Sequence, residues 1–124
     1  MGLEKLQGQL SAFISTWTED ATASGGVATA THAAESNKSH YITGFSATSY
    51  DTSSGAGVST IAIKDDTDTI MTFYCDNGVA AEGNGITHSF SSPIQITEGN
   101  PCSISITNDS SFDSVAANLW GFTS

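Results

Sequence analysis

The stretch PIQITEGNPCSISIT, residues 93–107, decides the fold class of this chain. In its second half Cys102, Ile104 and Ile106 alternate with serine and threonine, and in its first half Ile94 and Ile96 alternate with polar residues. Because successive side chains of a strand point to opposite faces, this period of two predicts strands with one buried face and one solvated face. Strands of that kind are typical of antiparallel sheets that pack on one side only.

Outward from this stretch, segments rich in β-branched and aromatic residues recur between short clusters of Gly, Asn, Asp, Pro and Ser. This rhythm predicts strands over 26–34, 39–50, 57–65, 68–76, 85–91, 93–99, 101–109 and 114–124, with a further first strand at 10–17. The segment LEKLQGQLSAFI carries only a weak helical period, which Gly8 interrupts. We therefore expect an all-β fold, an antiparallel two-sheet β-sandwich, and a jelly roll of about eight strands fits the count best.

The length of 124 residues fits a single domain. We expect an N-terminal arm over residues 1–9 and one β-sandwich domain over residues 10–124. In the strand predicted at 39–50, alternation puts Tyr41, Thr43 and Phe45 on one face, and His40 and Ile42 on the other. Both faces then carry apolar bulk, which is expected when one face packs in the core and the other meets a partner.

The charge balance excludes several classes of partner. The formal net charge is −10, with three lysines and no arginine, so the basic surface that binds nucleic acid is absent and anionic membranes are disfavoured. No apolar run approaches the roughly 18 residues of a membrane span, and the first ten residues do not resemble a secretory signal. We therefore expect synthesis and folding in the cytoplasm of the cell that makes the protein.

The cysteines, Cys75 and Cys102, are interpreted as two small buried hydrophobic residues, since a chain made in a reducing cytoplasm rarely forms disulfides. Alternation places Cys102 with the buried isoleucines, in agreement with this interpretation. A disulfide between adjacent strands stays open, because spacing alone does not exclude one.

No pattern of catalytic or ligand residues stands out. The chain has no G-x-S-x-G elbow, and His32 and His40, which are close enough in sequence to meet across a hairpin, form no H-x-H pair. The acidic runs at 65–68 and 108–113 are interpreted as turns, with a weak calcium site as the alternative. We therefore predict no enzyme: no catalytic residue, no cofactor, no metal site and no small-molecule substrate.

Three further segments carry a resemblance to a known group of proteins. TATHAAESNKSHYITGFSATSY (29–50) joins an Ala/Thr-rich strand through a short turn to a strand beginning His-Tyr-Ile-Thr-Gly; STIAIKDDTDTIMTFYCDNG (59–78) is similar to a hairpin with an acidic turn; and ANLWGFT (117–123) ends in an aromatic–Gly–aromatic pattern. Together they resemble small jelly-roll accessory proteins of tailed-bacteriophage virions, over residues 25–123.

The resemblance implies a non-enzymatic decoration or cement protein on the outside of the capsid. Its partner would be the major capsid protein, whose subunits it would bridge, and it would form a homotrimer; no nucleic acid, membrane or catalytic residue is implied. The apolar residues of the arm would anchor it, and His40 and Trp120 are candidate subunit contacts. The predicted anchors are Leu3, Leu6, Leu10, Phe13 and Ile14.

The alternative is a tail or receptor-binding module that recognises carbohydrate. Two long loops, 51–57 and 75–85, favour it, because recognition loops gather at the ends of a sandwich. Trp17 and Trp120 are of the residue type that stacks on sugars, although core packing or a subunit contact is the favoured role for Trp120.

Overall fold

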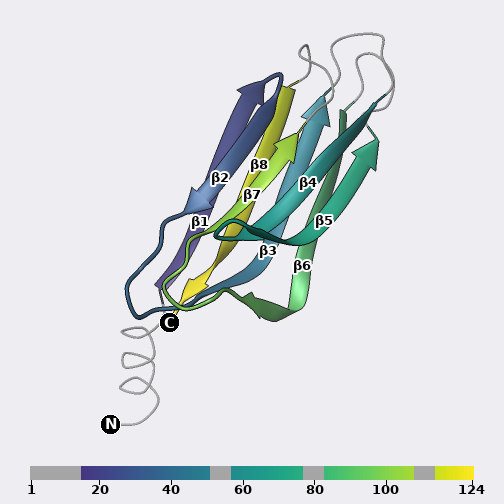
Figure 1. Cartoon of the computed structure of the whole chain (residues 1–124). Coiled ribbons are helices and arrows are strands. Elements are labelled where there is room, and N and C mark those ends of the chain that lie inside the picture. Colours follow the sequence, from purple (N-terminus) through teal and green to yellow (C-terminus); the bar gives the residue numbers. More distant parts are fainter. Residues whose placement is uncertain (1–14, 51–56, 77–82, 108–113) are drawn as a thin grey trace.

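A computed structural model describes residues 15–50, 57–76, 83–107 and 114–124 of the chain. All regular secondary structure in these residues is β-strand (Figure 1). The strands, in chain order, are β1 (Ser15–Ser24), β2 (Val27–His32), β3 (His40–Tyr50), β4 (Val58–Asp65), β5 (Asp68–Asp76), β6 (Gly83–Gln95), β7 (Cys102–Thr107) and β8 (Ser114–Thr123).

The strands form two four-stranded antiparallel sheets that pack face to face. Sheet A has the order β1-β8-β3-β6 and sheet B the order β2-β7-β4-β5. Every connection between consecutive strands passes from one sheet to the other, except the β4–β5 hairpin. This interleaving is the jelly-roll arrangement, so the predicted fold class is confirmed. The predicted arm, residues 1–9, lies outside the described residues.

The core lies between the sheets and is built by period-two alternation. Ile104 and Ile106 of β7 pair with Ile63 and Ile61 of β4, and all four side chains are fully buried. Phe45 of β3 packs against them from sheet A. Polar residues occupy the intervening positions of β7, as the sequence predicted, because only one face of each sheet is removed from water.

Two strand predictions were wrong. The first described strand, β1 (Ser15–Ser24), continues seven residues beyond the end of the strand predicted at 10–17, whose residues 10–14 are outside the described part. The segment predicted at 85–91 and residues 93–95 of the segment predicted at 93–99 belong to one strand, β6, which continues through Pro93, whereas residues 96–99 follow it in the connection to β7. Proline lacks an N–H for the sheet ladder, but β6 is the edge strand of sheet A, where that loss is tolerated.

The face prediction for β3 was wrong at Phe45. A bulge shifts the register between Ile42 and Gly44, where Ile42 pairs with Ile94 and Gly44 with Ser89 of β6. The bulge reverses the alternation. His40 and Ile42 therefore point inward before it, and Phe45 points inward after it instead of sharing a face with Tyr41.

The two cysteines form no disulfide, and both side chains are buried in the core. Burial, with the negative charges of Asp65 and Glu19 adding to it, raises the pKa of the Cys102 thiol to about 12. The thiol therefore stays protonated near neutral pH and acts as a small hydrophobic group. This agrees with the interpretation from alternation.

No helix in the described ranges has the length and apolar character to cross a membrane.

At the end of the sandwich that holds the β2–β3 connection, Asp65 accepts hydrogen bonds from Thr97 N (2.9 Å), Thr97 Oγ1 (2.7 Å) and Asn100 Nδ2 (2.9 Å). Partial burial alone would raise the pKa of Asp65, but these hydrogen bonds outweigh it and lower the pKa below its ordinary value. The carboxylate thus fastens the end of β4 to the β6–β7 connection.

Candidate functional site

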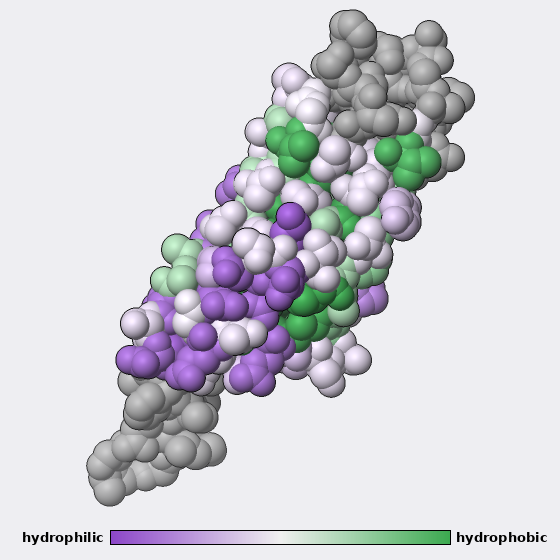
Figure 2. Space-filling view, in the orientation of Figure 1, coloured by the Kyte–Doolittle hydropathy of each residue, from purple (hydrophilic) through white to green (hydrophobic). Residues whose placement is uncertain are grey.

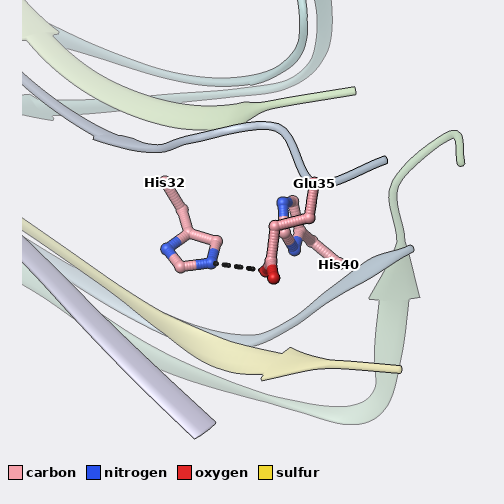
Figure 3. A group of neighbouring side chains, drawn as sticks. All are labelled: His32, Glu35 and His40. Carbon is pink, nitrogen blue, oxygen red and sulfur yellow. Dashed lines mark ion pairs between the residues drawn. The ribbon is translucent and has the colours of Figure 1, made fainter. Parts of the chain in front are cut away.

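A group of polar side chains, extending from the buried interior to the surface, lies where β2 ends and β3 begins. His32 is the last residue of β2 and His40 the first of β3, and their ring centroids are 4.4 Å apart in an edge-to-face arrangement. Trp17 of β1 stacks on His32 with ring centroids 4.2 Å apart. Glu35, in the connection between β2 and β3, points its carboxylate towards His32 (Figure 3). We call His32, Glu35 and His40 the histidine cluster.

His40 is fully buried and held at both ring nitrogens. Its Nε2 lies 2.8 Å from the carbonyl oxygen of Ala33, and its Nδ1 lies 2.7 Å from Thr123 Oγ1. A carbonyl only accepts, so Nε2 carries the proton and Nδ1 accepts from the Thr123 hydroxyl. The ring has no exposed surface in this protomer through which it could meet a neighbouring subunit, the role the sequence suggested for it.

His32 is oriented by a carboxylate. Its Nδ1 lies 2.9 Å from Glu19 Oε1, and its Nε2 lies 3.8 Å from Glu35 Oε2. An ionised carboxylate only accepts, so Nδ1 donates to Glu19 and Nε2 faces Glu35. The indole of Trp17 covers one side of the ring. The position and tautomer of His32 are therefore set by neighbours on β1.

The histidine cluster offers three ligand atoms, one ring nitrogen each from His32 and His40 and one carboxylate oxygen from Glu35, that all lie within 4.8 Å of one another. The sequence brought His32 and His40 to attention as a pair across a hairpin but predicted no metal site. It missed Glu35, Glu19 and Thr123, because their contacts depend on how the β2–β3 connection and the β1–β8 pair fold over the rings. Two imidazoles and one carboxylate are donors that Zn²⁺ accepts.

The outer face of sheet A carries a group of half-buried aromatic residues, here called the aromatic face: Tyr41, Trp120 and Phe122. Tyr41 and Phe122 stack with centroids 4.8 Å apart. Trp120 lies across Gly44, where a Cβ would collide with the indole ring. Trp120 thus stands on an outer face rather than in the core, and its role as a subunit contact stays a prediction.

The outer face of sheet B carries a strip of exposed apolar residues, here called the β5 strip: Val58, Ile70 and Tyr74. Their side chains are 51%, 40% and 66% exposed. Tyr74 lies opposite Thr60 of β4, one step along the same face from Val58. Figure 2 shows hydrophobic residues exposed over the β4–β6 side of the molecule, and hydrophilic residues towards the end that holds the β2–β3 connection.

A hollow of about 660 Å³ lies at the opposite end of sheet A from the histidine cluster. It is formed where β1 and β3 end and β6 and β8 begin, and hydroxyl groups, the amide of Asn84 and the ring of Tyr50 line it. Tyr50 is 44% exposed. An aromatic ring among hydrogen-bonding groups is suited to a polar ligand with apolar faces, such as a sugar.

The remaining predicted site residues fall outside the described ranges. They are the arm anchors Leu3, Leu6, Leu10, Phe13 and Ile14, together with most of the loops predicted at 51–57 and 75–85. The anchoring role of the arm stays a prediction.

Comparison with known proteins shows the fold. No protein-family profile and no curated protein sequence matches the chain. Dimeric latent PorU from Porphyromonas gingivalis superposes with a TM-score of 0.52 at 12% identity, over 89% of this chain and 13% of that one. A chain of infectious bursal disease virus, Gx strain, superposes with a TM-score of 0.51 at 16% identity, over 89% of this chain and 32% of that one.

A chain of the T13 particle of infectious bursal disease virus gives a TM-score of 0.40 at 15% identity, over 90% of this chain and 35% of that one. The present chain therefore spans about a third or less of the length of each of these chains. At these identities the likeness concerns the fold alone. The class is a jelly-roll β-sandwich, of the kind seen in a virus chain and in a bacterial protein.

Proposed function

We propose that this protein is a non-enzymatic structural protein of a phage virion, a decoration or cement protein that binds the outside of the capsid. The observation that carries the proposal is the β5 strip. Large apolar side chains that stay exposed on a folded monomer favour contact with another protein, and Tyr74, the most exposed of them, is of a residue type enriched at interface centres.

A second surface supports a bridging role. The aromatic face lies on the outside of sheet A, whereas the β5 strip lies on the outside of sheet B, so the two face away from each other. A block with contact surfaces on both sides can touch two neighbours at once, and many weak contacts repeated over a shell add up through multivalency. The proposed neighbours are subunits of the major capsid protein and the other members of a homotrimer.

The charge fits a location on the surface of a virion. A net charge of −10 keeps many copies soluble and disfavours binding to the genome. The likeness to a virus chain at a TM-score of 0.51 supports the fold that this function needs and no more than the fold. Synthesis in the host cytoplasm before assembly is part of the same proposal.

The test is electron microscopy of particles made by co-expressing this chain with the major capsid protein of the same genome. The proposal expects regular extra density on the outside of the shell. Tyr74→Asp should remove that density, because it places a charge in the β5 strip. Thr87→Asp, on exposed β6, adds the same charge elsewhere and should keep it. Bare shells with the unaltered chain would reject the proposal.

The hollow favours a second candidate function, a tail or receptor-binding module that recognises carbohydrate. Its lining combines an exposed tyrosine with hydroxyl and amide groups. A glycan array probed with the purified chain tests this. Tyr50→Ala should abolish any binding seen, whereas Tyr74→Ala, on the other sheet, should leave it unchanged. A silent array would count against this candidate.

A further inference from the structure

We propose that the histidine cluster binds a divalent transition-metal ion of the Zn²⁺ class through His32 Nε2, His40 Nε2 and the Glu35 carboxylate. This inference is independent of the proposed function and adds a site to it. The three side chains converge from the end of β2, the start of β3 and the connection between them (Figure 3). Their ligand atoms already lie within 4.8 Å of one another.

The neighbours of both histidines are arranged as in metal sites. Protein ligands to zinc commonly use one ring nitrogen for the metal while the other is hydrogen-bonded to a carboxylate or another acceptor, which fixes the orientation of the ring. Here Nδ1 of His32 donates to Glu19, and Nδ1 of His40 is 2.7 Å from Thr123 Oγ1. In both rings Nδ1 is therefore held, and the proposal assigns Nε2 to the metal, although Nε2 of His40 now donates to the Ala33 carbonyl.

Binding requires one local change at His40. Its Nε2–H now donates to the Ala33 carbonyl, so the proton must move to Nδ1, where Thr123 Oγ1 can accept it. A neutral ring then binds the metal with no net release of a proton from His40. The Ala33 carbonyl oxygen must also turn away from His40, because it now lies 2.8 Å from the nitrogen that would bind the metal. Ala33 is exposed, so water can then replace the donor that its carbonyl loses.

Binding also requires a modest contraction. Bonds of about 2.0–2.1 Å in a tetrahedral site place ligand atoms about 3.3 Å apart. Glu35 is exposed and belongs to the connection rather than to a strand, so its side chain can move towards the two rings, and a small rotation of the rings has to bring their nitrogens together. His32 and His40 are oriented by Glu19, Thr123 and the sheets. The proposed site thus combines the ring nitrogens of two oriented histidines with the carboxylate of the more mobile Glu35 side chain. Water would occupy the fourth coordination position of the metal.

The ligand set selects the class of ion. Two imidazoles and one carboxylate suit Zn²⁺, Co²⁺ or Ni²⁺, whereas Mg²⁺ and Ca²⁺ require mostly oxygen ligands. A bound ion would join the β2–β3 connection to the end of the sandwich and so stabilise the folded state by mass action. We infer a structural rather than a catalytic role for it.

The experiment uses the full chain without a histidine tag. It is titrated with Co²⁺ and with Zn²⁺ and followed by visible absorption, competition with a metal indicator and thermal unfolding. We expect one ion per chain, a Co²⁺ spectrum of a four- or five-coordinate site, and a rise in Tm on the order of 10 °C at about a hundredfold excess of Zn²⁺ over Kd. Equal concentrations of Mg²⁺ should change neither signal.

Variants separate this site from incidental binding. His32→Gln and Glu35→Gln should each weaken binding at least roughly tenfold, and Glu19→Gln, behind His32, by about 10–100-fold. The matched controls are His88→Gln and Glu98→Gln, both at exposed positions. They should bind like the unaltered chain. Glu35 and Glu98 are exposed, so neither of these variants should impair folding.

Several results would overturn the proposal. One is the absence of a one-to-one Co²⁺ or Zn²⁺ complex. Others are equal binding by the Glu35→Gln and Glu98→Gln variants, or a loss on His88→Gln as large as that on His32→Gln. Capsid attachment does not enter any of these readouts, so failure here leaves the proposed function intact, and failure of that function leaves the metal site intact.

Discussion

Different kinds of side chain fill the middle of the sandwich and the end that holds the histidine cluster, here called the histidine end. In the middle, isoleucines of β4 and β7 meet Phe45 with no polar side chain between them. At the histidine end, the interior is filled by Trp17, His32 and His40, and hydrogen bonds to Glu19, Thr123 and Ala33 hold the two histidine rings. Apolar burial stabilises without direction, whereas hydrogen bonds stabilise only in one geometry. The apolar middle therefore contributes mainly to the free energy of unfolding, whereas the hydrogen bonds of the histidine end fix the positions of the histidine rings.

The largest expected effect comes from breaking the middle. Ile104→Ala removes a fully buried side chain between two sheets and leaves a cavity, so the free energy of unfolding should fall by about 4 kcal/mol. Urea unfolding followed by tryptophan fluorescence measures it. Ile104→Val, which removes one methylene, should cost about 1 kcal/mol. Equal losses for the two variants would contradict a tightly packed middle.

Next in size is an added methyl group at the boundary of the two regions. A Cβ on Gly121 would overlap the backbone carbonyl of Tyr41 and crowd Trp17, so Gly121→Ala should lower the free energy of unfolding by about 3 kcal/mol. For Gly44→Ala the three atoms nearest to the added Cβ all belong to the half-buried ring of Trp120, a side chain that can move aside. Thermal unfolding should show a clearly smaller loss for Gly44→Ala, and the reverse order would refute this account.

A smaller loss is expected at the histidine end. Thr123→Val keeps the shape of the side chain but leaves Nδ1 of the buried His40 without its donor, so the free energy of unfolding should fall by about 2 kcal/mol. Thr123→Ser keeps the hydroxyl and should recover most of the loss. If valine and serine are equally tolerated, the hydrogen bond does not hold this end closed. Chemical unfolding of the three proteins side by side decides the point.

The smallest expected effect is at Asp65, and it depends on pH. Asp65→Asn weakens three hydrogen bonds, so the free energy of unfolding should fall by about 1 kcal/mol at pH 7. The pKa of Asp65 is lower in the folded than in the unfolded state. Its stabilisation is therefore present above the ordinary value of 3.8 and is lost as pH falls through the folded pKa.

Unfolding curves between pH 7 and pH 2 measure this dependence. The difference between the unaltered chain and Asp65→Asn should shrink at the acid end. Asp68→Asn, at an exposed position of the same hairpin, should be close to neutral throughout. A difference that grows on acidification would contradict the assigned direction.

The same contrast explains how much could be predicted from the sequence. The strands of the apolar middle, such as β7 and β4, were predicted because a strand buried on one face has apolar and polar residues in alternation. In β1 the inward positions hold Trp17 and Glu19 beside alanines, so the apolar alternation that marks a strand is missing. Its Glu19 is inward because it binds His32, a partner that only the folded chain brings near.

Local irregularities set the other limit. The bulge after Ile42 reverses which residues of β3 point inward. Gly44 is an isolated glycine of the kind that accompanies bulges, but it does not tell which residues change face. The close approach of His32 and His40 was considered from their spacing alone. The third ligand atom, from Glu35, depends on the path of the β2–β3 connection, where Asn37 adopts a positive φ of 61°. The spacing in sequence thus suggested that His32 and His40 meet, whereas the approach of Glu35 follows only from the folded path of the connection.

The position of β8 between β1 and β3 has a consequence for folding kinetics. Sheet A cannot close until β8 pairs on both sides, and its pairing with β1 joins Ser15 to Thr123. Contacts so distant in sequence slow folding. A growing chain without β8 would hold β1 and β3 with unpaired edges, where strand-to-strand association between chains begins. The threonines and Asp20 on the exposed side of β1 are polar residues that disfavour such association during synthesis.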